Sequence, residues 1–203
     1  ARPAKGHYEL PEGARPNPGY RKRGVAELSL VSFNCFSLRQ SGRLNSLLED
    51  CGREGVMAVC LQGTQMYFPQ QPTRRREWKV RTQKGGPWLV LSWGPPSSSD
   101  PGGVMVVLNM HVFTQTDIRE RKDPPLGVKG RLGGVHLRRQ ARGGQDGLDL
   151  LLSTGYAFQN TENEQKRQNF WDALIRMHAG GSNRTTHLNA IDANGHIGAG
   201  LTQ

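Results

Sequence analysis

Four polar residues follow short apolar runs of this sequence, at positions where side chains could do chemistry. They are Asn34, Tyr156, Asp192 and Asn194. Strand ends hold side chains rigidly at one edge of a sheet while loops close over them, so binding sites form there. An Asp-x-Asn pair on a β-like backbone points two oxygen-bearing side chains the same way. Such a pair suits a hard cation, a phosphoryl oxygen or a water molecule.

The same residues have structural interpretations. Asp-Ala-Asn-Gly at 192–195 is a good turn sequence, and on that fragment alone the turn is favoured over a ligand pair. Asn34 can be a strand-end turn former, and Tyr156 a half-buried core aromatic. For His196, a surface loop position is the favoured interpretation.

The elements that must position these residues alternate at the start of the chain. Residues 28–33 have the pattern of a buried strand, and residues 56–61 predict a second one. Between them, residues 44–51 place apolar side chains at i, i+3, i+4 and i+7, which predicts one face of a helix. Gly52 or Gly55 is expected to end that helix. These elements form an α/β unit.

The middle of the chain is richer in strands. Short apolar runs separated by Gly, Pro and Ser predict strands at 78–80, 88–93, 104–108, 135–137 and 148–153. This spacing favours a sandwich or layered sheet over a Rossmann-type domain. Helical spacing over 163–177 puts Phe170, Leu174 and Met177 on one face, and 186–191 predicts a final strand.

The charge of the chain favours a polyanionic partner. Lys and Arg outnumber Asp and Glu by 27 to 17, which gives a formal net charge of +10. Nucleic acid is the commonest such partner, and the alternative is a plain basic surface. Basic clusters are expected in loops at 74–76, 119–122 and 138–142. The candidate nucleic-acid-binding residues are Arg74, Arg75, Arg76, Arg138, Arg139 and Arg142.

Composition divides the chain into two segments. Residues 1–24 are rich in Pro and Gly and carry the basic cluster 21–23. This segment cannot bury enough apolar area to offset its chain entropy, so it is expected to be an extended arm unless it lies along a partner. Residues 25–203 are expected to form one domain.

The cysteines indicate a reducing environment. Cys35, Cys51 and Cys60 are odd in number and lack C-x-x-C spacing, so buried reduced thiols are expected. An intracellular location follows, with nucleus and organelle not distinguished. No apolar run approaches the roughly 20 residues that a membrane span needs.

The order of the motifs resembles that of a known family. After Asn34 come Leu-Gln-Gly-Thr at 61–64, a Gly-Gly-led strand at 102–108, Gly-Tyr-Ala at 155–157 and Asp-Ala-Asn-Gly-His-Ile-Gly at 192–198. This series is similar to the endonuclease/exonuclease/phosphatase family, and particularly to the endonuclease domains of non-LTR (LINE-type) retrotransposons. In those domains, runs like Leu-Gln-Glu-Thr and Gly-Asp-x-Asn-Ala-x-x-Gly recur at comparable separation. The resemblance covers residues 28–198.

The resemblance implies a fold and a chemistry. The fold is a four-layered α/β sandwich, and the reaction is Mg²⁺-dependent hydrolysis of phosphodiesters. By position, Asn34 would bind the metal or orient a catalytic carboxylate, and Tyr156 would lie against the scissile phosphate. Asp192 would position or activate the attacking water, and Asn194 would stabilise the phosphoryl oxygens.

Departures from the family pattern bear on catalysis. Gly63 stands where the family carries its metal-binding glutamate, and no nearby acidic residue is an obvious substitute. The family's C-terminal portion, which ends in Ser-Asp-His, has no counterpart in residues 1–203. Without that portion an open sheet edge is expected, unless the natural protein is longer or a partner chain or the arm fills that place. A smaller departure is Ala157-Phe158, where the family usually has a proline two residues after the tyrosine.

Three functional hypotheses remain. The first is a degenerate, retrotransposon-derived pseudoenzyme that binds DNA or RNA, or serves as a structural subunit of a larger assembly, with no cofactor. The second is an active Mg²⁺-dependent endonuclease. The third is a phosphatase acting on small phosphorylated molecules, which the basic clusters do not favour.

Overall fold

The chain has a mixed α/β fold with two sheets. The computed structural model describes residues 28–70, 75–83, 85–141, 147–159, 161–179 and 182–194. These residues form two β-sheets and two α-helices. The predicted arm 1–24, Arg74, Arg142 and His196 lie outside the described residues.

The first sheet has five strands in the spatial order β1-β2-β5-β4-β3. The strands are β1 (Leu30–Asn34), β2 (Ala58–Gln62), β3 (Arg76–Arg81), β4 (Pro87–Trp93) and β5 (Val104–Asn109). Helix α1 (Arg43–Arg53) connects β1 to β2, which lie parallel, and the other pairs are antiparallel.

The second sheet has four strands in the order β6-β7-β8-β9. The elements are β6 (Ile118–Lys122), β7 (Leu132–Arg139), β8 (Leu148–Tyr156) and β9 (Thr186–Asp192), with the short 3-10 helices η1 (Gln115–Asp117) and η2 (Leu126–Val128) on either side of β6. Helix α2 (Glu164–His178) connects β8 to β9, and these two strands are parallel.

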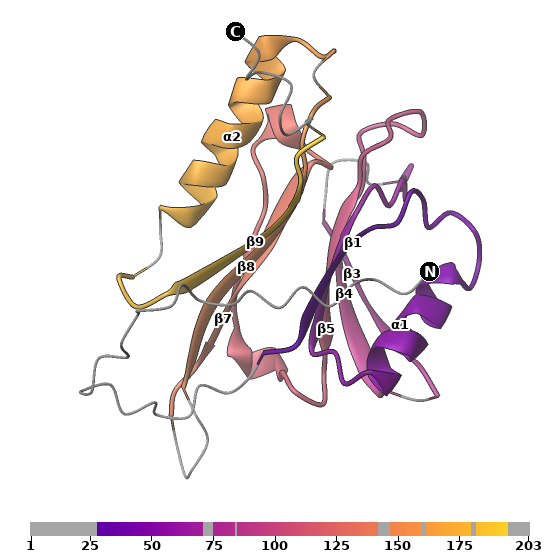
Figure 1. Cartoon of the computed structure of the whole chain (residues 1–203), viewed down its shortest axis with the longest axis vertical. Coiled ribbons are helices and arrows are strands. Elements are labelled where there is room, and N and C mark those ends of the chain that lie inside the picture. The colour runs from indigo at the N-terminus through magenta and orange to yellow at the C-terminus, as the bar shows by residue number, and fades with distance from the viewer. Residues whose placement is uncertain are drawn as a thin grey trace, which may run out of the picture.

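The two sheets face one another, and each helix lies against the outer face of one sheet (Figure 1). The core between the sheets contains alternate residues of both, such as Cys60, Val106 and Leu152. The intervening residues of the first sheet, such as Val59 and Leu61, pack against α1. Because both faces of β2 are covered, all five of its residues are buried.

The helices form where the apolar spacing predicts them. Leu44, Leu48 and Cys51 are the buried residues of α1. Helix α2 begins after Asn163, whose side chain accepts a 2.7 Å hydrogen bond from the backbone N–H of Gln165. This cap satisfies one of the free amides at the helix N-terminus. Phe170 and Met177 of α2 then pack against the second sheet.

One prediction about the basic clusters is wrong. Residues 119–122 were expected in a loop, but they belong to β6, which pairs with β7. Arg138 and Arg139 likewise end strand β7 rather than lying in a loop. The sequence Ile-Arg-Glu-Arg-Lys of β6 has no apolar alternation, so its strand conformation comes from pairing with its neighbour.

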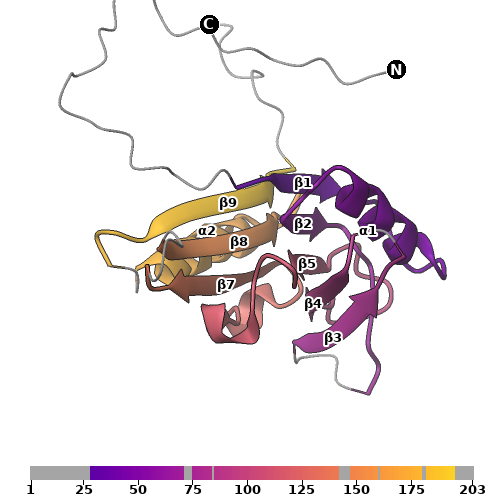
Figure 2. The same cartoon turned by 90° about the horizontal axis from the view of Figure 1, so that it is seen from below.

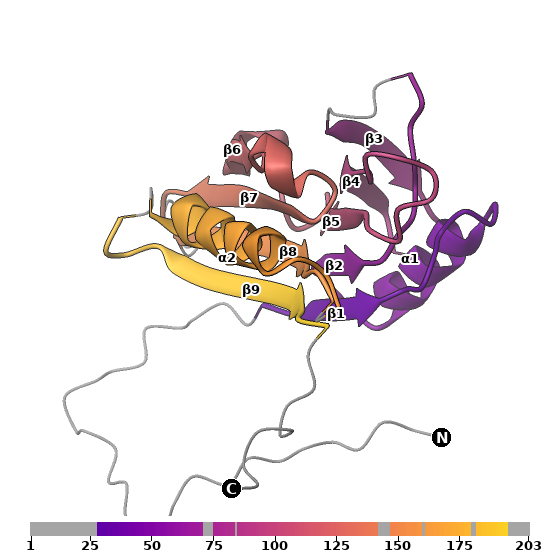
Figure 3. The ribbon, with the colours of Figure 1, turned by 90° about the horizontal axis from the view of Figure 1, so that it is seen from above.

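Two strands lie at open edges on the same side of the molecule. Within the described ranges, β1 pairs only with β2 and β9 only with β8. Figures 2 and 3 show these two edges next to each other. Phe33 of β1 and Leu188 of β9 are exposed there. Among the described helices, none combines the length and the apolar character that crossing a membrane requires.

Candidate functional site

The ends of two parallel strand pairs meet at one end of the molecule. In the first sheet the last paired residues of β1 and β2 are Asn34 and Gln62. In the second sheet the last paired residues of β8 and β9 are Tyr156 and Asp192. Because parallel strands end at the same edge, the two sheets bring these polar residues together. The structure therefore brings Asn34, Tyr156 and Asp192 to the same end of the molecule.

A hydrogen bond between Asn34 and Asp192 joins the two sheets. Nδ2 of Asn34 donates to Oδ2 of Asp192 at 2.5 Å. Oδ1 of Asn34 accepts from the backbone N–H of Phe36 at 3.1 Å. Both ends of the Asn34 amide are thus engaged, and its orientation is fixed toward the carboxylate.

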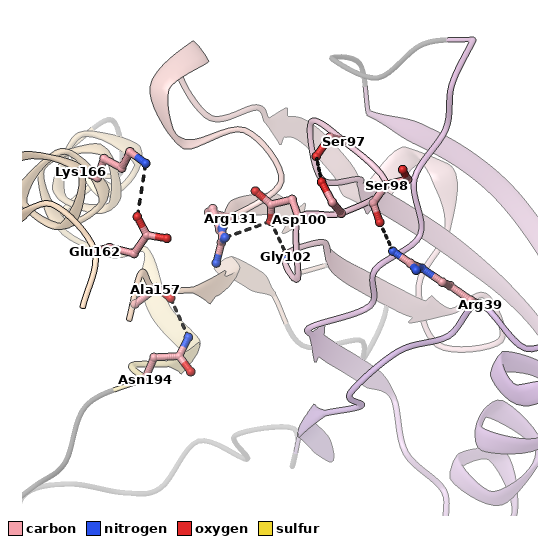
Figure 4. A network of polar contacts seen from close by, with 11 residues as sticks. Arg39, Ser97, Ser98, Asp100, Gly102, Arg131, Ala157, Glu162, Lys166 and Asn194 are labelled. Atoms are coloured by element: carbon pink, nitrogen blue, oxygen red, sulfur yellow. Dashed lines mark hydrogen bonds and ion pairs between the residues drawn. The ribbon is translucent and has the colours of Figure 1, made fainter. Parts of the chain in front are cut away.

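Asn194 lies in a turn that follows β9. Oδ1 of Asp192 accepts from the backbone N–H of Asn194 at 3.0 Å, which is the bond of an Asx turn. Asn194 has a φ of 47°, and its Nδ2 donates to the carbonyl of Ala157 at 2.6 Å (Figure 4). The turn interpretation is confirmed. The expectation of a β-like backbone through Asn194 is wrong, because the strand ends at Asp192.

Gly63 lies between Asn34 and Tyr156 with a backbone that suits glycine. Its φ is 63°, in the left-handed region. A Cβ atom at this position would lie 2.8 Å from Oδ1 of Asn34 and 3.7 Å from Cε2 of Tyr156. A residue with a side chain would also carry about 1–2 kcal/mol of backbone strain. Any side chain placed at position 63 would therefore enter the site directly, but only with movement of Asn34.

Arg131 places a buried positive charge beside Tyr156. Its carbonyl accepts from the backbone N–H of Tyr156 at 2.7 Å. Its Cζ lies 5.2 Å from the ring centroid of Tyr156 and 4.7 Å from that of Phe158. A cation over an aromatic face is attracted by the negative face of the ring. These contacts hold the ring of Tyr156 in one position next to Gly63.

A carboxylate partner compensates Arg131. Only 5% of Arg131 is exposed, and its Nη2 donates to Oδ1 of Asp100 at 2.9 Å. The same oxygen accepts from the backbone N–H of Gly102 at 2.7 Å (Figure 4). Sequence reasoning missed both residues. The only feature of the sequence that could have indicated Arg131 is its place between Gly130 and the apolar start of β7.

Gln62 holds the sheets together behind the site. It is 2% exposed, and its Nε2 lies 3.0 Å from Oγ1 of Thr154 and 3.1 Å from the carbonyl oxygen of Ala190. Buried polar groups are costly unless they are hydrogen-bonded, so these partners specify one relative position of the sheets. The glutamine of the Leu-Gln motif therefore positions the site without entering it.

Arg39 is an exposed cation in the segment between β1 and α1. Its Nε donates to the carbonyl of Gln65 at 3.0 Å, and its Nη2 donates to the carbonyl of Ser98 (Figure 4). Both acceptors are uncharged, and no ion pair involves Arg39 in the part of the chain that the structure describes. Its full positive charge is thus available to an anion. Arg39 was not among the residues predicted from the sequence.

The predicted basic residues mostly have partners within the protein. The contacts are Arg75 with Asp123 at 2.6 Å, Arg76 over the ring of Phe68 at 4.9 Å, Arg138 with Asp149 at 3.8 Å, and Arg139 with Asp117 at 2.6 Å. Arg138 and Arg139 line an open cavity of about 590 Å³. This cavity lies at the opposite end of β7 from Arg131. Arg138 and Arg139 therefore lie away from the candidate site.

The donor set does not fit the carboxylate magnesium site that the family resemblance implies. Mg²⁺ prefers a near-octahedral shell of oxygens that includes carboxylates. Position 63 offers no side chain, and each oxygen of Asp192 already accepts a hydrogen bond. Nowhere in the described ranges do three His, Cys, Asp or Glu side chains gather. The acidic residues that precede Gly63 in the sequence do not replace the missing carboxylate. They are Glu49, Asp50 and Glu54, and they lie on or directly after α1.

Comparison with known proteins adds no assignment. No family model matches the chain, and a search of curated proteins found no match. The family resemblance therefore depends on the sequence motifs alone.

Proposed function

We propose that the chain is an endonuclease/exonuclease/phosphatase-like domain, with the four-layered sandwich of that family, that binds nucleic acid and is impaired in hydrolysis. The observation that carries the proposal is at Gly63. Asn34 and Tyr156 lie next to it and Asp192 bonds to Asn34, yet the position presents a left-handed backbone and no carboxylate. Metal-assisted phosphoryl transfer depends on positioning and charge stabilisation, so loss of the metal ligand removes most of the rate.

The charges at the site support contact with phosphate. Arg39 is exposed, and no described carboxylate pairs with it. The net charge of +10 would draw a polyanion to the protein. The phosphate backbone of DNA or RNA, bound across this end of the sheets, is the ligand that this distribution favours.

The open edges support a place in a larger assembly. Unpaired strand edges invite pairing with another chain. We expect a protein partner over β1 and β9, where Phe33 and Leu188 are exposed. Amide hydrogen exchange tests this, because backbone amides of β9 should exchange faster than those of β8 in the isolated chain. Equal protection of β8 and β9 would argue against an unpaired edge.

A cleavage assay tests the catalytic part of the proposal. The chain is incubated with Mg²⁺ or Mn²⁺ and plasmid, single-stranded DNA, RNA or p-nitrophenyl phosphate. We expect no turnover above that of an Asp192→Ala variant. Robust plasmid nicking by the unmodified chain, abolished in Asp192→Ala, would overturn the proposal and identify an active Mg²⁺-dependent endonuclease. Turnover of the small phosphate ester alone would identify a phosphatase.

Two variants at position 63 test whether it is the metal position. Gly63→Glu adds a carboxylate, and Gly63→Ala carries similar backbone strain without one. We expect Gly63→Glu to bind Mg²⁺ at least tenfold more tightly than Gly63→Ala, as measured by calorimetry. Equal affinities would show that this position does not face a metal site.

A further inference from the structure

Two histidine rings meet at the end of the second sheet that is far from the candidate functional site. His178 is the last residue of α2, and His187 is the second residue of β9. His187 pairs in register with Leu151, whereas Asp192 at the other end of β9 pairs with Tyr156. The two Nδ1 atoms lie 2.6 Å apart, and the ring centroids lie 4.8 Å apart.

Two polar side chains orient the His178 ring. Oγ of Ser153, on β8, donates to Oδ1 of Asn189 at 2.6 Å. The same Oγ lies 3.3 Å from Nε2 of His178. A serine hydroxyl has one proton, and Asn189 receives it, so Nε2–H of His178 must be the donor to Ser153.

This assignment determines where the lone pairs point. With its proton on Nε2, an uncharged His178 has its lone pair on Nδ1, directed at His187. Without a ligand, the Nδ1–H of His187 donates to that lone pair.

We propose that Nδ1 of His178 and Nδ1 of His187 form a binding site for a divalent transition-metal ion such as Zn²⁺. The ion replaces the shared proton, which moves to Nε2 of His187, so that both rings stay neutral. Zn–N bonds are about 2.0–2.1 Å, so two nitrogens on a tetrahedral ion lie roughly 3.3 Å apart. The rings need to separate by about 0.7 Å from their present contact, which small side-chain rotations provide.

The surroundings of the pair have the features of a metal site. Metal-bound histidines commonly donate their other ring N–H to a fixed acceptor, and Ser153 is that acceptor for His178. Imidazole nitrogen suits Zn²⁺, Cu²⁺ and Ni²⁺ rather than Mg²⁺. No third His, Cys, Asp or Glu of the described residues joins the pair. Two coordination positions would then be open to water or a small anion.

A Zn²⁺ titration tests the proposal on the full chain after removal of metals with a chelator. Calorimetry measures the number of ions bound by the unmodified protein and by His178→Gln, His187→Gln and His111→Gln. His111 is an exposed histidine after β5 and serves as the matched control. We expect one equivalent of Zn²⁺ to be lost in His178→Gln and in His187→Gln, and none in His111→Gln. Ser153→Ala should weaken binding about tenfold, because it removes the acceptor that orients the ring.

Measurements on the unmodified protein cover the case in which a variant fails to fold. Zn²⁺ should shift the ¹⁵N resonances of Nδ1 in both His178 and His187 and should raise the thermal unfolding midpoint. Absence of Zn²⁺ binding, or resonances of the two rings that do not respond to Zn²⁺, would overturn the proposal. Unchanged stoichiometry in folded His178→Gln and His187→Gln would also overturn it. None of these readouts involves nucleic acid or hydrolysis, so they are independent of the proposed function.

Discussion

Nδ2 of Asn34 and Oδ2 of Asp192 are hydrogen-bonded at 2.5 Å although 158 positions separate the two residues in the chain. The bond connects the ends of β1 and β9, which are the edge strands of different sheets. The residues that define the candidate site therefore also hold the two sheets together at this end. A role in stability and a role in binding cannot be assigned to them separately without measuring both.

The contributions of Asn34 and Asp192 to the free energy of unfolding should be coupled. In a double-mutant cycle of Asn34→Ala and Asp192→Ala, the coupling energy should be about 1–2 kcal/mol, because the acceptor is charged. Urea unfolding provides the measurement. Gln168→Ala with Asp172→Ala, an exposed hydrogen-bonded pair on α2, should couple by only about 0.3 kcal/mol. Strictly additive effects at Asn34 and Asp192 would contradict the bond.

Substitutions of Gln62 should separate the effect of shape from that of charge. Gln62→Met keeps the length of the side chain but loses the bonds to Thr154 and Ala190, at a cost of about 1–2 kcal/mol. Gln62→Glu turns a carboxylate toward carbonyl oxygens in a buried position, so its cost should be at least about 3 kcal/mol at pH 7. Chemical denaturation compares the two variants. If Gln62→Glu were as stable as Gln62→Met, the donor assignment of Nε2 would be incorrect.

Arg39 should determine part of the salt dependence of nucleic-acid binding. Each phosphate contact contributes about one unit to the slope of log affinity against log salt concentration. Arg39→Gln should therefore reduce the slope by about one, measured by fluorescence anisotropy with labelled single-stranded DNA. Arg53→Gln is the matched control, because Arg53 is exposed and already paired with Asp50. Equal slopes for Arg39→Gln and the unmodified chain would exclude Arg39 as a phosphate contact.

Asp117 should make the protein sensitive to acid. Hydrogen bonds from Arg139, at 2.6 and 3.0 Å, hold the pKa of this carboxyl below its usual value despite burial. A carboxyl whose pKa is lowered on folding stabilises the protein above its unfolded pKa of about 3.9. That contribution is lost as the pH falls through the lower, folded pKa.

The comparison variants for this prediction are Asp117→Asn and Arg139→Gln. At pH 7 each should lower the free energy of unfolding by about 2 kcal/mol. Thermal unfolding followed from pH 7 downward should show the difference between the unmodified protein and Asp117→Asn shrinking below about pH 4. A difference that stays constant over this range would show that Asp117 has the same pKa in the folded and unfolded chain.

Local apolar patterns predicted most of the described elements. Leu44, Leu48 and Cys51 recur at helical spacing, and they are the buried face of α1. The three cysteines are buried free thiols, as expected, and burial raises the pKa of Cys60 to about 12. Strand β6 was missed because charged residues dominate it and its conformation depends on β7. A pattern read from a short stretch of sequence contains no information on the strand with which that stretch will pair.

The supporting residues of the candidate site were beyond the reach of such patterns. Gln62 contacts the carbonyl of Ala190 across 128 positions, and Arg131 contacts Asp100 across 31. The order of the motifs indicated the site residues themselves. The buried donors Gln62 and Arg131 could not be predicted, because their partners are brought close only by the packing of the folded chain. The partners of the basic residues could not be predicted for the same reason, since Asp117 and Asp123 pair with arginines that lie far from them in sequence.

The left-handed backbone at Gly63 limits which mutations can change the site in one step. A codon change that introduces glutamate would meet the Asn34 carboxamide and a conformation that side chains adopt only under strain. Such a change would therefore lower the stability of the folded chain, and a second substitution near Asn34 could compensate for that loss. The effect of a carboxylate at position 63 therefore depends on the residues around it, so its evolutionary gain would be epistatic.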